Sequence, residues 1–231
     1  MRYLMVVLAL FLSACSHQYQ MSYLQAPAAT PESLALHRVG LPPAIPELEH
    51  TTLVNTRLIN HNYLKLGYRS FGSSVFKTTE PDPLKSTVDA DNAALTQAQT
   101  VGADMVVQLP GRLTKITVLN NRCCLRETTN YIALYFIKYR YPLGVMYHDM
   151  SNADRKKIQS NYGVTTSLTI VDSPAYKAGI IPGDIITAFD DIPVDGGGSL
   201  DRYVEQHKNT TIKLTLFRDG QVLTKSVPLG G

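Results

Sequence analysis

Hydrophobic positions change their spacing several times along this chain of 231 residues, and the changes predict its elements. Over residues 47–138, helical spacing predicts one helix that stops near Gly67 and another over residues 90–101, where Gly102 is a plausible C-cap. Each helix is followed by an apolar strand, and two further strands are expected near residues 113–119 and 128–138. The order α-β-α-β-β-β predicts a small α/β-type domain.

A second pattern begins after Lys138 and predicts a β-rich domain with two or three short helices over residues 139–231. Ser173 is a good N-cap for a very short helix, Pro174 suits its first position, and Gly179 suits a left-handed end. Asp219-Gly220 separates two strand-like runs, and both central positions of a type I′ hairpin need a positive φ. The chain as a whole is therefore expected to be α+β.

The run from Ser173 to Ile186, together with Tyr141-Pro142-Leu143-Gly144-Val145, resembles the PDZ domain of periplasmic high-temperature-requirement serine proteases. The resemblance implies a β-sandwich or partly open barrel over about residues 140–228. It also implies that the loop around Gly144 binds the C-terminal carboxylate of a peptide, because a glycine between apolar residues lets neighbouring amides converge into a nest.

A peptide is therefore expected to add as a strand between the strand after Gly144 and a helix that Ser199 is expected to cap. The expected partners are hydrophobic protein C-termini or peptides. An alternative stays open, in which Leu200 and Val204 only fill the core. The residues expected at this site are Leu143, Gly144, Val145, Leu200, Tyr203 and Val204.

The first fifteen residues indicate export. Arg2 precedes an apolar stretch that is too short to span a bilayer, and Leu12-Ser13-Ala14-Cys15 resembles a bacterial lipobox. The resemblance implies that residues 1–14 are a signal peptide and that Cys15 carries a covalent lipid. Ser16 replaces the aspartate of an inner-membrane retention signal, so we expect an anchor in the outer membrane that faces the periplasm. An ordinary signal peptide, with Cys15 incidental, stays open.

Residues 15–46 contain five prolines among small and polar residues and show no sustained apolar period. Proline fixes φ and disfavours helix in the residue before it. We therefore expect an extended, solvated tether between the lipid and the first domain.

No pattern in the sequence predicts catalysis. The six histidines lack metal-ligand spacing, no glycine-rich nucleotide loop is present, and a net charge of +3 gives no reason to expect nucleic acid. We expect a protein that is not an enzyme, with no cofactor other than the lipid on Cys15. Adjacent Cys123 and Cys124 leave three states open: a strained disulfide, a link to another chain, or free thiols.

Two other hypotheses remain open from the sequence. One is a structural subunit of an envelope complex whose peptide groove is closed. The other is an uncharacterised enzyme within residues 47–138, centred on a polar cluster composed of Arg122, Cys123, Cys124, Arg126 and Glu127.

Overall fold

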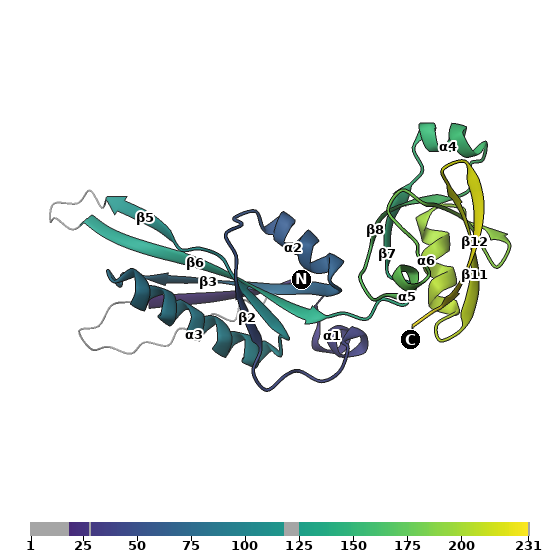
Figure 1. Cartoon of the computed structure of the whole chain (residues 1–231). Helices are drawn as coiled ribbons and strands as arrows, with labels where there is room; N and C mark the ends of the chain where they lie inside the picture. Colours follow the sequence, from purple (N-terminus) through teal and green to yellow (C-terminus); the bar gives the residue numbers. More distant parts are fainter. Residues whose placement is uncertain (1–18, 28, 118–124, 231) are drawn as a thin grey trace, which may run out of the picture. The chain divides into compact units, whose positions relative to one another are not determined.

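The structure is a computed structural model that describes residues 19–27, 29–117 and 125–230 (Figure 1). The chain divides into two compact units. Residues up to 60 and residues 69–138 form the first unit, while residues 61–68 and 139–231 form the second. Each unit combines an antiparallel or mixed sheet with helices, so the expected α+β class is confirmed.

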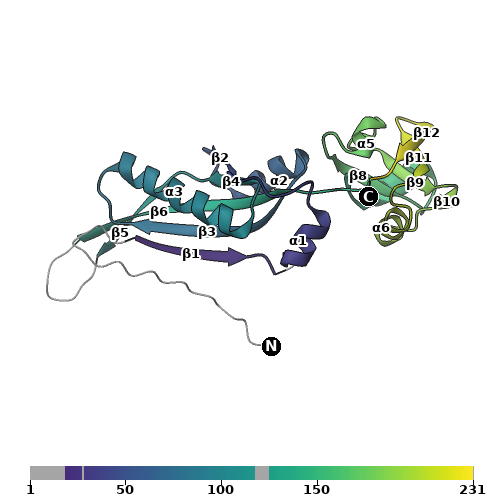
Figure 2. The same cartoon turned by 90° about the horizontal axis from the view of Figure 1, so that it is seen from below.

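The first unit is built on one sheet with the strand order β1-β3-β6-β4-β2, and β5 pairs with β6 outside this path. Strands β2 and β4 are parallel, while β4 and β6 are antiparallel. Helix α3 lies across one face of this sheet (Figure 2). The strands are β1 Tyr19–Gln25, β2 Glu47–His50, β3 Tyr68–Thr78, β4 Met105–Gln108, β5 Arg112–Thr117 and β6 Leu125–Lys138.

Helix α3, Pro83–Val101, packs on the sheet through small residues. Ser86, Ala90, Ala94 and Ala98 recur every fourth position and are all buried, which gives one narrow face that can approach the strands closely. The helix begins earlier than residue 90, because Asp82 caps it and Pro83 occupies its first turn. Gly102 ends it with a φ of +67°, as expected.

The prediction of a tether over residues 15–46 is wrong for much of its described part. Residues Tyr19–Gln25 form β1, which pairs antiparallel with β3 through seven residues. Residues Pro31–His37 form helix α1, in which the Thr30 side chain accepts a hydrogen bond from the Ser33 amide. Proline misled the interpretation here, because Pro31 stands in the first turn of a helix, where it is well tolerated.

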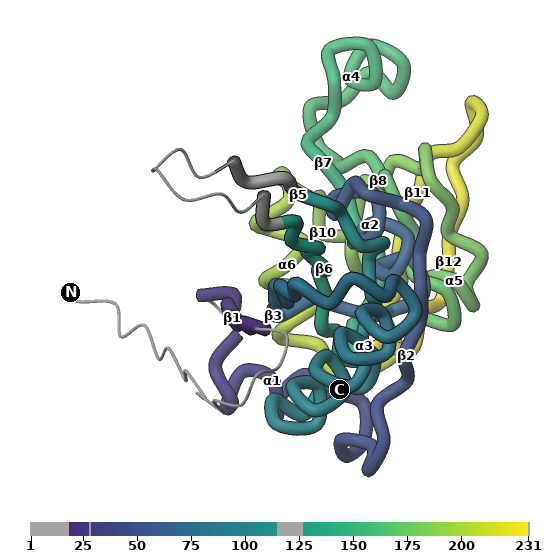
Figure 3. The backbone as a smooth tube through the Cα atoms, turned by 90° about the vertical axis from the view of Figure 1, so that its left-hand side faces the viewer, coloured from purple at the N-terminus to yellow at the C-terminus, as the bar shows by residue number. Residues whose placement is uncertain are grey.

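The second unit contains an antiparallel sheet with the order β12-β11-β9-β8-β7, and β10 pairs with β9. Strands β12 and β7 stand at opposite ends of this order, so the described strands form an open sheet. Helix α4 projects from the connection between β7 and β8 (Figures 1 and 3). The elements are β7 Val145–Asp149, α4 Asn152–Ile158, β8 Val164–Thr169, α5 Pro174–Lys177, β9 Ile185–Phe189, β10 Ile192–Pro193, α6 Gly197–Gln206, β11 Thr211–Arg218 and β12 Gln221–Pro228.

Most of the predicted turns and caps of the second unit are confirmed. Ser173 caps α5 by accepting from the Tyr176 amide, and Gly179 has a φ of +71°. Asp219 and Gly220 have φ values of +49° and +84°, as a type I′ hairpin requires. Ser199 does not cap α6. The helix starts two residues earlier, and the Ser199 hydroxyl donates to the Gly196 carbonyl at 2.8 Å.

The predicted boundary between the domains also needs a correction. Residues 61–68, which include the end of helix α2, Thr56–Lys65, belong to the second unit. The Val171 amide donates to the Lys65 carbonyl at 2.9 Å, and the Tyr139 amide donates to the Gly67 carbonyl at 2.9 Å. These bonds join segments far apart in the sequence, so a pattern along the chain does not reveal them.

An enclosed ion pair ties the second unit together. Asp184 is fully buried, and its carboxylate accepts hydrogen bonds from Arg218 at 2.5 and 2.6 Å and from the Ile181 amide at 2.9 Å. Arg218 also donates to the Gly179 carbonyl at 2.7 Å. The pair therefore joins the end of β11 to the turn between α5 and β9.

We expect Arg218→Met to lower the free energy of unfolding of this unit by about 3–5 kcal/mol, because it leaves a buried carboxylate without its cation. Urea denaturation followed by hydrogen exchange in β9 and β11 measures this. Arg202→Met, at an exposed position on α6, is the matched control and should change stability little. Equal effects of the two substitutions would contradict the importance of the pair.

The docking of β1 can be tested at Gly72. A Cβ atom built on Gly72 would lie 2.4 Å from the Tyr23 hydroxyl oxygen and 2.8 Å from its Cζ. We expect Gly72→Ala to push Tyr23 aside and to destabilise the pairing of β1 by about 1–3 kcal/mol. Hydrogen exchange of residues 19–25 should become faster, whereas Gly198→Ala, which meets nothing within 4 Å, should leave it unchanged. Unaltered protection of β1 in Gly72→Ala would overturn this prediction.

Candidate functional site

Strand β7 has one side paired and one side free among the described residues. It lies at the end of the sheet order, next to β8. Val145 stands opposite Thr169, and the Ile170 amide donates to the Gly144 carbonyl at 2.9 Å just outside this pair. This geometry makes Val145 and Thr169 a pair without mutual hydrogen bonds. The amide and carbonyl of Val145 consequently point away from β8, toward the free edge. The register shifts between Met146 and Tyr147, but Thr166, which stands opposite Tyr147, bonds to Gly183 and Asp184 instead, so the amide and carbonyl of Tyr147 also point toward the free edge.

The loop before β7 directs its carbonyls inward. The Leu143 carbonyl accepts from the Ala175 amide at 2.9 Å, and the Gly144 carbonyl accepts from the Ser173 hydroxyl at 3.3 Å. The amides of Leu143 and Gly144 donate to no atom of the described residues. Pro142 has no amide hydrogen, so the loop leaves the amides of Leu143 and Gly144 without an acceptor among the described residues.

Gly144 is held by a very close contact. It has a φ of +82°, and a Cβ atom on it would lie 2.1 Å from the Cβ of Ser173. A side chain at this position would be strained by its backbone and would collide with the cap of α5. The same serine thus fixes both the helix start and the loop.

The expected pocket residues are for the most part enclosed. Leu143, Val145 and Leu200 are 4%, 8% and 0% exposed and belong to one core cluster. Leu200 therefore fills the core, in agreement with the alternative that the sequence left open for it. Tyr203 and Val204 are only partly buried against the same cluster, so both reach the surface.

Tyr147 is a residue of this region that the sequence interpretation missed. Side chains alternate along a strand, so Val145, Tyr147 and Asp149 share the face of β7 that looks toward α6. The Tyr147 hydroxyl is within hydrogen-bond distance of the Gly197 carbonyl, at 3.1 Å, and of the Asp201 carboxylate. The Gly197 amide donates to Asp149 at 3.3 Å. The period-two spacing from Val145 was the signal that could have found Tyr147.

The tyrosine stays protonated across the physiological pH range. Burial of the ring raises the pKa of Tyr147 well above its usual value, and the hydrogen bond to Asp201 raises it further. The hydroxyl is therefore a hydrogen-bond donor that connects β7 with the start of α6.

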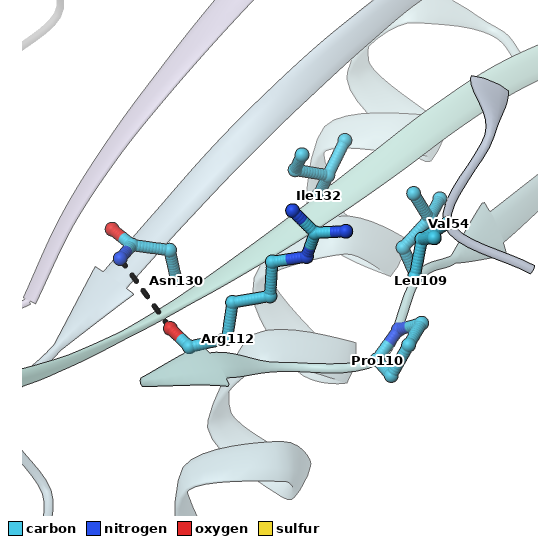
Figure 4. A pocket seen from close by; sticks show the side chains of 6 residues that line it. All are labelled: Val54, Leu109, Pro110, Arg112, Asn130 and Ile132. Carbon is cyan, nitrogen blue, oxygen red and sulfur yellow. Dashed lines mark hydrogen bonds between the residues drawn. The ribbon is translucent and has the colours of Figure 1, made fainter. Parts of the chain in front are cut away.

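Two of the hollows among the described residues lie in the first unit. The smaller is a cavity of about 90 Å³ between Leu109, Pro110, Ile132 and their neighbours, and the Arg112 side chain extends across it (Figure 4). Asn130 donates to the Arg112 carbonyl at 3.4 Å and to the Thr114 hydroxyl at 2.8 Å. The larger hollow, of about 840 Å³, is lined by Thr79, Glu80, Pro81, Pro83, Thr87, Gly111, Leu113, Glu127, Thr129 and Tyr131.

Several predicted chemical groups lie outside the described residues. These are Cys15, Arg122, Cys123 and Cys124, together with the side chain of Arg126. Glu127 is described and borders the larger hollow. Within the described ranges, no group of three or more His, Cys, Asp or Glu side chains is placed to hold a metal ion. Likewise, none of the described helices has the length and apolar character needed to cross a bilayer.

Comparison with known proteins bears on the part of the second unit that begins in β8. An edge strand beside a helix, with free amides at its start, is the arrangement of a peptide-recognition module. A family model described as a PDZ domain matches residues 168–218, from β8 to the end of β11. Residues 168–218 are therefore a PDZ domain, which confirms the resemblance.

One curated relative is a probable periplasmic serine endoprotease of the DegP-like type from Marinomonas sp. (strain MWYL1). It is 36% identical to this chain over 90 residues, which is 38% of this chain and 19% of that protein. The chain thus spans only about a fifth of the length of this relative. The PDZ domain of this chain is thus similar to the PDZ domains of HtrA and DegP proteins.

Among solved structures, the HtrA3 PDZ domain bound to a phage-derived ligand is similar at 20% identity, with a TM-score of 0.33; the match covers 38% of this chain and 88% of that one. The HtrA-type protease AlgW with a decapeptide is similar at 18% identity, with a TM-score of 0.34; this match covers 52% and 41%.

The packing of Gly144 generates a stability prediction. We expect Gly144→Ala to lower the free energy of unfolding of the second unit by about 1–3 kcal/mol more than Gly220→Ala does. Gly220 shares a positive φ of +84° but has open space around it, so it isolates the cost of the backbone conformation from that of the collision. Chemical denaturation of the two variants measures the difference. Equal losses would mean that the Ser173 contact is unimportant.

Proposed function

We propose that this protein is a lipid-anchored periplasmic adaptor that binds protein C-termini or peptides in the groove between β7 and α6. One observation carries the proposal. The amides of Leu143 and Gly144 have no acceptor among the described residues, and they stand at the start of the free edge of β7.

The free edge supplies the main chain contacts. An extended peptide that pairs with Val145 and Tyr147 gains backbone hydrogen bonds whatever its sequence. At the end of such a strand, a terminal carboxylate can accept from the converging amides around Gly144. The side chain of the last residue then meets Val145 and Val204, so a hydrophobic residue is preferred there. Binding of this kind needs no cofactor and no chemical step.

The membrane anchor rests on Leu12-Ser13-Ala14-Cys15, and a periplasmic location agrees with the name of the Marinomonas relative. Strand β1 starts at Tyr19, only a few residues after the proposed lipid on Cys15. At most ~3.6 Å per residue, the intervening chain spans on the order of 15 Å. The first unit would consequently lie close to the membrane surface rather than at the end of a long tether.

The alternative, a structural subunit with a closed groove, predicts a different arrangement around the same backbone amides. In that case the amides after Gly144 are covered by the protein itself. Their lack of partners among the described residues favours the adaptor.

Recognition of a C-terminus can be tested with the full chain. We expect a peptide with a hydrophobic last residue and a free carboxylate, selected from a random library, to bind at least about tenfold more tightly than its C-terminal amide, since charge-assisted hydrogen bonds are the stronger ones. Isothermal titration calorimetry measures the ratio. Equal affinities would refute C-terminal recognition, and the absence of any enriched peptide would refute the adaptor.

The location of the site needs its own variant. Val204→Lys places a charge beside the last residue of the peptide and should weaken binding at least about tenfold, because a charge loses water there. Val222→Lys, on the exposed face of β12 with 70% exposure, is the control and should bind like the parent chain. If both variants bind equally well, the peptide site lies elsewhere.

A further inference from the structure

The alternation of side chains decides which peptide residue meets Tyr147. A strand that pairs antiparallel with the free edge of β7 places directly opposite residues on the same face. With its carboxylate at the amides of Leu143 and Gly144, the peptide has its last residue opposite Val145. Its third residue from the end is then opposite Tyr147, and both of these side chains point toward α6.

The space opposite Tyr147 is already filled. The tyrosine ring reaches from β7 to the first turn of α6, where its hydroxyl meets the Gly197 carbonyl and the Asp201 carboxylate. A Cβ atom on Gly197 would lie 2.7 Å from Cε2 of this ring. The ring thus fits against a glycine with no room to spare.

Hydrogen bonds between β7 and α6 hold the tyrosine ring in this position. Asp149, from the end of β7, accepts from the Gly197 amide at 3.3 Å, which fastens the start of α6 to the strand. Turning the ring outward would break the contacts of its hydroxyl with Gly197 and Asp201. A bulky peptide side chain would therefore have to displace a bonded tyrosine, whereas a very small one would not.

We propose that Tyr147 is the specificity-determining residue of the groove and restricts it to peptides with glycine or alanine at the third position from the C-terminus. This inference rests on the proposed function. The inference follows from two observations: the Tyr147 side chain bridges β7 and α6, and Gly197 has no side chain that would displace the ring.

The test compares three peptides that differ only at the third residue from the end, which is glycine, leucine or phenylalanine, in the background of a library-selected binder. With the full parent chain we expect the glycine peptide to bind at least about tenfold more tightly than the other two. In Tyr147→Ala the three affinities should agree within about threefold. Fluorescence anisotropy measures all of them.

Tyr147 also packs against the core. Tyr147→Leu therefore serves as a second variant that keeps apolar contacts while it removes the bridge to α6, and it should likewise lose the preference. Tyr162→Ala, at an exposed tyrosine outside the groove, is the control and should retain it.

The outcomes separate this inference from the proposed function. Equal binding of the three peptides by the parent chain overturns the role of Tyr147 and leaves the adaptor standing. A preference for glycine that persists in both Tyr147 variants overturns it as well. Binding only after Tyr147 is replaced means that the ring closes the groove to every peptide, and the selection proposed here is then wrong. If neither the parent chain nor the variants bind any peptide, the adaptor function itself fails.

Discussion

The contact between Gly144 and Ser173 is the constraint on which the candidate site depends. Only a residue without a side chain fits there, because a Cβ atom on Gly144 would lie 2.1 Å from that of Ser173 and the backbone of Gly144 is left-handed. Ser173 caps α5 at the same time. The loop carbonyls are consequently bonded inward, whereas the amides of Leu143 and Gly144 have no acceptor among the described residues. One packing arrangement thus produces both the contact between Gly144 and Ser173 and the two amides without an acceptor.

An exposed strand edge is a liability as well as a binding site, since it can pair with any extended chain. In the second unit, the Tyr147 side chain reaches from β7 to α6 beside this edge, where its hydroxyl contacts Gly197 and Asp201. The first unit has a comparable edge at β1, whose sequence contains no charged residue or proline.

Local chemistry explains why much of the second unit was predictable. Ser173, Gly179 and Asp219-Gly220 each act on the backbone within a few residues, so their roles are visible in the sequence. The errors occurred where partners are distant. Strand β1 exists because β3 accepts it, and residues 61–68 join the second unit through bonds to Tyr139 and Val171. Pro31 and Pro83 stand in the first turns of helices. In the sequence alone, a proline at such a position cannot be told from a proline in a loop.

The sequence by itself determined the α+β class and the PDZ-like order of turns and strands, because these depend on residue preferences that act locally. Only the tertiary structure decided which apolar residues reach the surface and which fill the core. Leu200 and Val204 share one helix, yet the first is fully enclosed and the second reaches the surface. The role of Tyr147 became visible only through the contacts of its hydroxyl with Gly197 and Asp201 on α6. Burial and contact across elements are properties of the packed molecule, and spacing along one strand or helix does not contain them.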